Sequence, residues 1–406
     1  MLTYEEALQH ILGGTPTPRP STVRLDDALG LVLADAIISP LDLPRFDNSA
    51  VDGYAIRSPD VQPGANGTSV ASLRVIGASE AGRPFRGMVG EGEAIRILTG
   101  AQVPQGADTV IMQEHVERRS DRLIVQRRPE PGQHIRRCGE DLRRGAQVLA
   151  TGTLLRPQEI GLLAALGYRA VPVFPRPTVA VLATGDELQA PGTLLRPGRI
   201  YESNSYLLSA LIRRAGARAI RLGVVRDVRR LLRAKISRGL AADVLIVSGG
   251  VSVGDKDFVR QVARRCGVRQ IFWQVSIKPG MPVFFGRRRR TVVFGLPGNP
   301  VSAFVTFEEF VKPALYRLMG RRWQDGYATP ATLATDLTLS MARRTHFLRV
   351  RCGFENGQRV AQPLNGQGSH QLHSLTEADG WIRVTADQGP LVAGTTVMMK
   401  SSEGLA

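Results

Sequence analysis

The chain has 406 residues, a formal net charge of +17 and only three cysteines. Its length exceeds what one ordinary hydrophobic core accommodates, which favours about two to four domains. No apolar stretch approaches the roughly 18 residues of a membrane-spanning helix, and the scattered cysteines argue against a disulfide framework.

The positive charge is mostly arginine, spread in short clusters without interleaved aromatic residues or a DNA-binding motif. Nucleic-acid binding is an alternative that this distribution disfavours. The only run, residues 287–290, lies between two apolar segments and is typical of a solvated turn between strands. The excess charge would still attract a small anionic substrate. Residues 1–6 lack the basic start of a signal peptide, so we expect a cytoplasmic protein without membrane contact.

The first 175 residues predict helices around a β-rich segment. Thr3 and Glu6 form a capping box for an N-terminal helix, and residues 25–36 indicate a second helix. Alternating apolar segments then predict strands and a small β-rich domain over about residues 45–143, with strands at 72–78, 94–98, 109–112 and 123–126. Residues 157–167 predict a helix that starts at proline and stops at glycine.

Residues 175–326 alternate between strand and helix patterns. Strands are expected at residues 178–183, 220–225, 244–247, 275–277 and 291–294. Helices are expected at residues 204–216, 228–238 and 300–311. This alternation predicts a doubly wound parallel sheet, whose ligand crevice lies beyond the carboxyl ends of the strands. Asn299 is placed to cap the helix that begins at Pro300, and the positive end of that helix would favour an anion at the crevice.

The most informative strand ending is Ser248-Gly249-Gly250, followed by Ser252, Asp255 and Asp257. Paired glycines allow positive φ or close approach to a ligand, and hydroxyls and amides can bind an oxyanion. Because the nearby carboxylates would repel a bare anion, an anion together with a divalent cation is favoured. A P-loop is disfavoured because Asp255-Lys256 stands where Lys-Ser/Thr would be needed. A tight turn with solvated charges is the alternative for this stretch alone.

Residues 327–406 change to short strand patterns separated by glycine and asparagine turns. Strands are expected at residues 331–339, 347–354, 381–384 and 395–399. A separate small β-barrel is the natural interpretation. The whole chain is therefore predicted to be multidomain, α/β plus β.

Several long strings of residues resemble the molybdopterin molybdenumtransferase family, whose eukaryotic relatives include the E domain of gephyrin. The strings are Pro44-Arg-Phe-Asp47, Asp52-Gly-Tyr-Ala55, Ile97-Leu-Thr99-Gly-Ala101, Gly139-Glu-Asp141, Thr184-Gly-Asp-Glu-Leu188, Ser248-Gly-Gly-Val-Ser-Val-Gly254, Ile277-Lys-Pro-Gly280 and Gly295-Leu-Pro-Gly-Asn-Pro-Val-Ser302. The resemblance covers almost the whole chain. It also includes residues 367–370, which resemble a family loop that faces the crevice.

The resemblance implies a domain order and an activity. Residues 21–44 and 144–174 would form one linking domain, with residues 45–143 inserted as the β-rich domain. Residues 1–20 would be the N-terminal helix, 175–326 the molybdopterin-binding domain and 327–406 the β-barrel. The implied reaction is Mg²⁺-dependent insertion of molybdate into adenylylated molybdopterin with release of AMP. The implied partners are a second copy of the chain and, transiently, other molybdenum-cofactor enzymes.

Both implied substrates are anions, so the site needs donors, cations and a divalent metal. We expect Glu187 and Asp257 to bind Mg²⁺, with Asp227 and Asp186 as further candidates. The expected catalytic residues are Asp52, Thr99, Asp141, Glu187, Asp227, Asp257 and Lys278. The expected oxyanion and substrate contacts are Ser248, Gly249, Gly250, Ser252, Pro297, Pro300 and Arg349. In the family, the positions of Asp52, Thr99 and Asp141 reach the crevice from a second subunit. An exposed turn carboxylate is the alternative for Asp52 and Asp141.

Two positions depart from the family pattern. Gln274 stands where lysine is common, and Met281 where lysine or arginine is frequent. The loss of two cations would weaken oxyanion binding, and the sequence leaves open the preference between molybdate and tungstate. A molybdopterin-binding scaffold without catalysis is the alternative function. The intact acids and Lys278 favour an enzyme.

Overall fold

The computed structural model describes residues 1–62, 71–251, 258–338, 344–385 and 387–402. The chain forms two compact units: Met1–Asp35, Gly152–Ile160 and Arg169–Ala406 make up the first, and Ala36–Thr151 and Gly161–Tyr168 the second. Among the helices in the described ranges, none is both long enough and apolar enough to cross a membrane.

The first unit contains a six-stranded mixed sheet with the order β17-β14-β18-β22-β21-β19. Its strands are β14 (Thr178–Thr184), β17 (Arg218–Val225), β18 (Val244–Ser248), β19 (Arg269–Trp273), β21 (Phe284–Arg288) and β22 (Thr291–Leu296). The first four in the order are parallel, whereas β21 pairs antiparallel with both of its neighbours, β22 and β19. The β21–β22 hairpin confirms the turn predicted for the arginine run. One arginine of this run also holds the segment that follows the N-terminal helix, since Arg290 Nη2 donates to Thr17 O at 2.7 Å.

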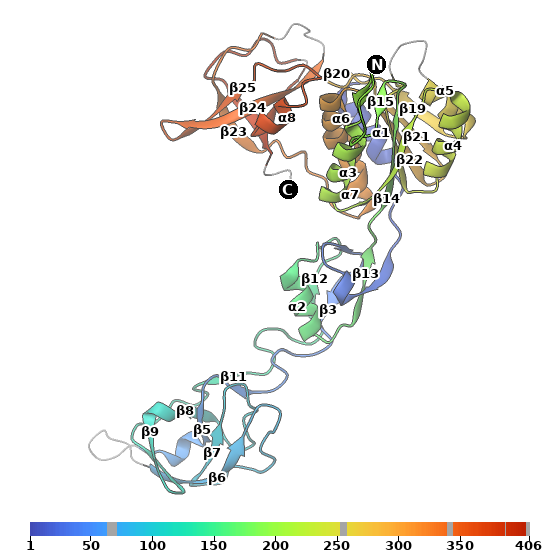
Figure 1. The fold of residues 1–406 in the computed structure, drawn as a ribbon. Helices are drawn as coiled ribbons and strands as arrows, with labels where there is room; N and C mark the ends of the chain where they lie inside the picture. The colour runs from blue at the N-terminus through green and yellow to red at the C-terminus, as the bar shows by residue number, and fades with distance from the viewer. Residues whose placement is uncertain (63–70, 252–257, 339–343, 386, 403–406) are drawn as a thin grey trace. The chain divides into compact units, whose positions relative to one another are not determined.

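Helices cover both faces of this sheet, which confirms the doubly wound arrangement (Figure 1). One layer contains α1 (Tyr4–Gly14), α3 (Asn204–Arg214), α6 (Pro300–Thr306), the π-helix η4 (Phe307–Val311) and α7 (Lys312–Leu318). The other contains α4 (Arg229–Gly239) and α5 (Phe258–Arg265). Successive side chains of a strand point to opposite faces, so Val179 and Val181 join the first core and Ala180 and Leu182 the second.

The C-terminal strands close into a β-barrel, as the sequence predicted. The strands are β23 (Thr329–Leu333), β24 (Thr345–Glu355), β25 (Gln358–Pro363), β26 (Gly380–Val384) and β27 (Thr396–Ser401), with the short helix α8 (Ser374–Glu377). Closure comes from the additional pairing of β24 with β26. The strand predicted at residues 275–277 was assigned to the wrong sheet: β20 (Ile277–Lys278) pairs with β24 of the barrel, Ile277 opposite Thr345.

The helix predicted for residues 25–36 is wrong. Only a 3₁₀ turn, η1 (Leu25–Asp27), forms there, between β1 (Ser21–Arg24) and β2 (Val32–Leu33). Both strands pair with β13 (Ala170–Phe174). Gly30 adopts φ +74° and its amide donates to Leu155 O at 2.7 Å, so a partner distant in sequence replaces the helical bond. The predicted helix at residues 157–167 is confirmed as α2 (Pro157–Ala165).

The second unit is β-rich, as predicted, with the sheet order β8-β5-β7-β6-β10-β9. Its strands are β5 (Gly53–Ile56), β6 (Ala71–Ser79), β7 (Glu93–Ile97), β8 (Thr109–Met112), β9 (Val116–Arg119) and β10 (Arg122–Val125). Shorter pairs join β4 (Asn48–Ser49) to β11 (Ile135–Arg136) and β3 (Ile37–Ile38) to β12 (Gln147–Leu149). The 3₁₀ turns η2 (Ser58–Asp60) and η3 (Gln113–His115) complete it. Gly53 is required where β5 pairs with β8, because a Cβ there would lie 1.9 Å from Ile111 O.

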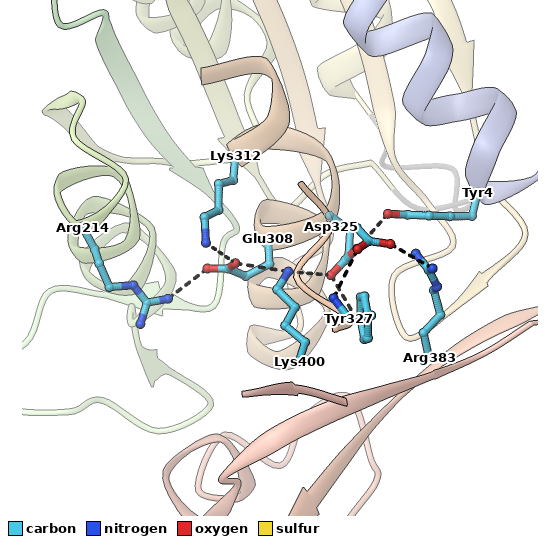
Figure 2. Close-up of polar contacts among 9 residues, drawn as sticks. Tyr4, Arg214, Glu308, Lys312, Asp325, Tyr327, Arg383 and Lys400 are labelled. Carbon is cyan, nitrogen blue, oxygen red and sulfur yellow. Dashed lines mark hydrogen bonds and ion pairs between the residues drawn. The ribbon is translucent and has the colours of Figure 1, made fainter. Parts of the chain in front are cut away.

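A buried charge cluster joins the helical layer to the barrel in the first unit (Figure 2). We use this name for Tyr4, Arg214, Glu308, Glu309, Lys312, Asp325, Tyr327, Arg383 and Lys400. Glu308 lies 2.9 Å from Arg214 Nη2, 3.0 Å from Lys312 Nζ and 3.6 Å from Lys400 Nζ. Glu309 accepts hydrogen bonds from Tyr4, Tyr327 and Lys400. Burial raises the pKa of both tyrosines, which keeps their hydroxyls protonated as donors.

Candidate functional site

A cavity of about 1100 Å³ opens where β14, β18 and β22 end. It is at least as large as a typical ligand pocket of about 300–1000 Å³. Its walls are the strand-end loops, residues 277–282 next to β20, and residues 367–370 of the barrel. All of the lining belongs to the first unit. The cavity lies at the strand rim where the sequence predicted a crevice, and the barrel loop faces it as the resemblance implied.

Two carboxylates in the cavity wall come from the ends of β14 and β17. The half-buried Asp227 accepts a hydrogen bond from the Thr184 hydroxyl at 2.5 Å. The exposed Glu187 folds over Gly185, where an added Cβ would lie 2.6 Å from its Oε1. Neither acid has an ion-pair partner within the described ranges. Asp186 differs, because its Oδ1 lies 3.4 Å from Arg226 Nε.

These oxygen donors fit Mg²⁺, which prefers one or two carboxylates together with water and substrate phosphates. In the part of the chain that the structure describes, no three acidic, histidine or cysteine side chains form a complete metal cage. The expected ligand Asp257 lies outside the described residues, as do Asp255 and Ser252. Glu187 and Asp227 are therefore the described side chains that could hold the metal.

The end of β18 forms the floor of the cavity. Gly249 and Gly250 adopt φ +91° and +63°, which confirms the expected positive φ. A Cβ on Gly249 would lie 2.4 Å from Thr184 O, so only glycine fits there. However, the Gly249 amide donates to Leu296 O at 3.0 Å. The expectation that this amide binds an oxyanion is corrected, because the neighbouring strand already occupies it.

Asn204 and Glu202 line the cavity but were not among the expected site residues. Asn204 is the first residue of α3, and its Nδ2 donates to Ser248 Oγ at 2.9 Å and to Gly298 O at 2.7 Å. Glu202 accepts from the Ser205 amide and hydroxyl at 2.6 and 2.5 Å. The sequence did contain a signal, since Glu202 and Ser203 directly precede a predicted helix, where a capping segment would stand.

Lys278 and Arg344 are the lysine and arginine of the described cavity wall. Lys278 is exposed and directly precedes Pro279 and Gly280 in the same wall.

Of the two positions that depart from the family pattern, Met281 lines the cavity. Gln274 adopts φ +74° and its amide donates to Val283 O, so it serves the backbone next to β21. The loss of charge at the cavity wall thus concerns Met281.

Arg349 does not line the cavity, which corrects its expected role as an oxyanion ligand. Its side chain is fully buried, and Nη2 donates to Gly366 O at 2.7 Å and Gly368 O at 3.3 Å. Burial lowers its pKa to about 10. Arg349 therefore supports the barrel loop from behind, and the loop itself faces the cavity.

The same loop is fixed from the α/β side. Asn299 holds the N-cap position of α6, but its side chain does not cap the helix as expected. Instead Nδ2 donates to Ser369 Oγ at 2.8 Å, and the Val301 amide donates to Ser369 O at 3.1 Å. This bond occupies the first amide of the helix, at the positive end that the sequence predicted would favour an anion. Pro297 and Pro300, two of the expected substrate contacts, line the cavity beside this junction.

The second unit holds the other expected catalytic residues. Asp52 Oδ1 accepts from both the amide and the hydroxyl of Thr99 at 2.7 Å. The hydrogen bonds from Thr99 lower the pKa of Asp52, which keeps its carboxylate ionised. Asp141 is exposed, and its amide donates to Leu43 O. The structure thus brings Asp52 and Thr99 together and leaves the Asp141 carboxylate at the surface.

Three protein-family profiles match successive parts of the chain. They are described as the MoeA N-terminal region (domain I and II) over residues 2–167, a probable molybdopterin binding domain over residues 180–317, and the MoeA C-terminal region (domain IV) over residues 330–400.

Relatives and a solved structure agree with these matches. The chain is 38% identical to a molybdopterin molybdenumtransferase of Haemophilus influenzae, over 98% of each chain. It is 39% identical to molybdopterin molybdenumtransferase 2 of Mycobacterium tuberculosis, over 94% of this chain and 95% of that one. A crystal structure of a molybdopterin biosynthesis MoeA protein from Pyrococcus horikosii is similar with a TM-score of 0.84 at 32% identity, and covers 99% of both chains.

Proposed function

The chain belongs to the molybdopterin molybdenumtransferase family of molybdenum-cofactor biosynthesis enzymes, and from this premise we propose that it inserts molybdate into adenylylated molybdopterin with release of AMP. One observation carries the proposal. A single large cavity presents two carboxylates without ion-pair partners in the described ranges together with cations and a hydroxyl donor. That combination suits two anions and a divalent cation.

In the proposed reaction, water cleaves the phosphoanhydride bond of the adenylylated substrate, which gives AMP and molybdopterin that keeps its own phosphate. The two dithiolene sulfurs then bind molybdenum, and the molybdate oxygen that they displace leaves as water with the two thiol protons. Lys278 and Arg344 would attract the oxyanions, and Ser248 would donate a hydrogen bond to them. Glu187, Asp227 and Asp257 would hold Mg²⁺, which neutralises phosphate oxygens when bound. Gly249 and Gly250 would shape the floor so that these donors converge.

A turnover assay tests this function. Purified protein is mixed with adenylylated molybdopterin, Mg²⁺ and molybdate, and AMP and metal-loaded cofactor are measured. We expect AMP release that requires both Mg²⁺ and molybdate and is lost in Asp257→Ala. Tight substrate binding without AMP release would favour the scaffold instead. Full activity of Asp257→Ala would remove that residue from the site.

We also propose that the site is completed by a second copy of the chain, because the resemblance assigns Asp52, Thr99 and Asp141 to a partner subunit. Subunit complementation tests this. Asp52→Ala and Glu187→Ala proteins, each inactive alone, are mixed and allowed to exchange subunits. A composite site predicts recovery of about a quarter of wild-type activity, because mixed dimers contain one intact site. No recovery after demonstrated exchange would contradict a composite site.

A further inference from the structure

We infer that Asn204 is a positioning residue that directs the Ser248 hydroxyl toward a bound oxyanion. The inference deepens the proposed function and rests on it, since it requires an anion at the end of β18. It concerns a side chain that the sequence did not single out and that connects three loops of the cavity wall.

The orientation of the Asn204 amide is fixed by its contacts. Nδ2 lies 2.7 Å from Gly298 O, which can only accept a hydrogen bond. An exchanged amide would place Oδ1 against that carbonyl oxygen, acceptor against acceptor. Nδ2 is therefore the donor, and its second hydrogen reaches Ser248 Oγ at 2.9 Å.

This bond determines what Ser248 can do. Because its oxygen accepts from Asn204, the hydroxyl hydrogen must point elsewhere. Inside the protein, the recorded acceptor is Pro297 O at 3.4 Å, which is long for an O–H···O bond. Ser248 is 2% exposed and lines the cavity, so an oxyanion there would be a better acceptor than Pro297.

Asn204 has a second effect on the same wall. It donates a hydrogen bond to the carbonyl oxygen of Gly298, another lining residue, which offsets the partial negative charge of that oxygen. Its own Oδ1 is buried without a hydrogen-bond partner in the described ranges, and the residue as a whole is 9% exposed. Natural proteins rarely leave a buried acceptor unpaired, and such groups call for an explanation. The unpaired Oδ1 follows from the two hydrogen bonds that Nδ2 donates, because they fix the orientation of the amide and leave Oδ1 facing no donor.

A double-mutant cycle tests the inference. Equilibrium binding of inorganic molybdate, and separately of inorganic phosphate, is measured with Mg²⁺ present for wild type, Asn204→Leu, Ser248→Ala and the double variant. We expect each single substitution to weaken binding about tenfold, as for a lost hydrogen bond to a charged group, and the double variant to bind about as weakly as either. Asn204→Asp should weaken binding more, because its carboxylate accepts the Ser248 proton and repels anions.

The control is Ser209→Ala, which removes a buried hydroxyl from the same helix α3 and should leave anion affinity unchanged. Thermal unfolding of every variant shows that it folds. Losses that multiply to about a hundredfold in the double variant would overturn the link from Asn204 to Ser248 while leaving the proposed function intact. Wild-type protein that binds neither anion would overturn the anion site itself, and this inference with it.

Discussion

The buried charge cluster and the cavity wall both contain several acidic side chains, but the acids of the cluster form ion pairs, whereas Glu187 and Asp227 form none in the described cavity wall. In the cluster, Glu308 is 3% exposed and lies within 4 Å of Arg214, Lys312 and Lys400. In the cavity wall, Glu187 and Asp227 have no such partner in the described ranges. Removing a charge from water is costly unless it is paired, whereas a hydrated carboxylate can remain unpaired. Ion pairing therefore separates acids that hold the fold from acids free to bind a ligand.

Arg349 is an intermediate case. It is as buried as Glu308, yet its contacts are backbone carbonyls of the barrel loop, and its Nε and Nη1 have no partner in the described ranges. The cost of burial appears as a lowered pKa, about 10. A charge kept under such conditions suggests a role in holding the loop at the cavity.

The largest expected effect is on stability, in the cluster. Glu308→Ala removes the shared partner of three cations, of which Lys312 and Lys400 are buried, and leaves those two lysines with a deficit of negative charge. We expect the free energy of unfolding to fall by about 3–5 kcal/mol, measured by urea denaturation. Glu187→Ala, the same chemical change in the cavity, is the matched control and should alter it by less than about 0.5 kcal/mol. Equal losses in the two variants would remove the distinction between the regions.

The next effect is on activity, in the cavity. Glu187→Gln keeps the shape of the side chain but weakens metal binding, so we expect AMP release to slow by about a hundredfold at fixed Mg²⁺. Raising the Mg²⁺ concentration should restore part of the rate. Asp186→Gln, next to it and already engaged by Arg226, should have a smaller effect. An Mg²⁺-independent defect would contradict a metal role for Glu187.

A smaller effect is expected at Arg349. Arg349→Met replaces a buried cation by an apolar side chain of similar length and releases Gly366 O and Gly368 O. We expect KM to rise about tenfold with kcat nearly unchanged, because the loop loses its support but no reacting group is removed. Arg351→Met, on the same strand but exposed, is the control. A fall in kcat at constant KM would instead favour direct contact with the substrate.

The smallest effect concerns a pair at the start of α2. Hydrogen bonding and the charge of Arg156 lower the pKa of Glu159 from 4.5 to about 2. The folded state therefore binds this proton less readily than the unfolded state, and the pair's contribution is present above pH 4.5 and lost as the pH falls toward 2. Urea midpoints measured across this range should fall less steeply for Glu159→Gln than for wild type. The exposed Glu91→Gln is the control, and parallel curves for all three proteins would contradict the coupling.

The sequence determined the features that depend on neighbouring residues. The capping box of Thr3 and Glu6, the strand 244–248 with its glycine turn and the hairpin at residues 287–290 all follow from local pattern. The crevice was also predictable, because parallel strands place their carboxyl ends at one rim whatever lies between them.

Only the tertiary structure decided the features that depend on distant partners. Residues 25–36 have a helical pattern, yet their backbone groups form hydrogen bonds with the loop at residues 153–155 and with the strand at residues 170–174. Ile277 pairs with the barrel because its strand partner is Thr345, which lies 68 residues later in the sequence. Arg349 and Asn204 received their roles in the same way. A polar side chain carries no local sign of which carbonyl or hydroxyl it will meet, and long-range pairing alone decides whether it binds a ligand, supports a loop or orients another donor.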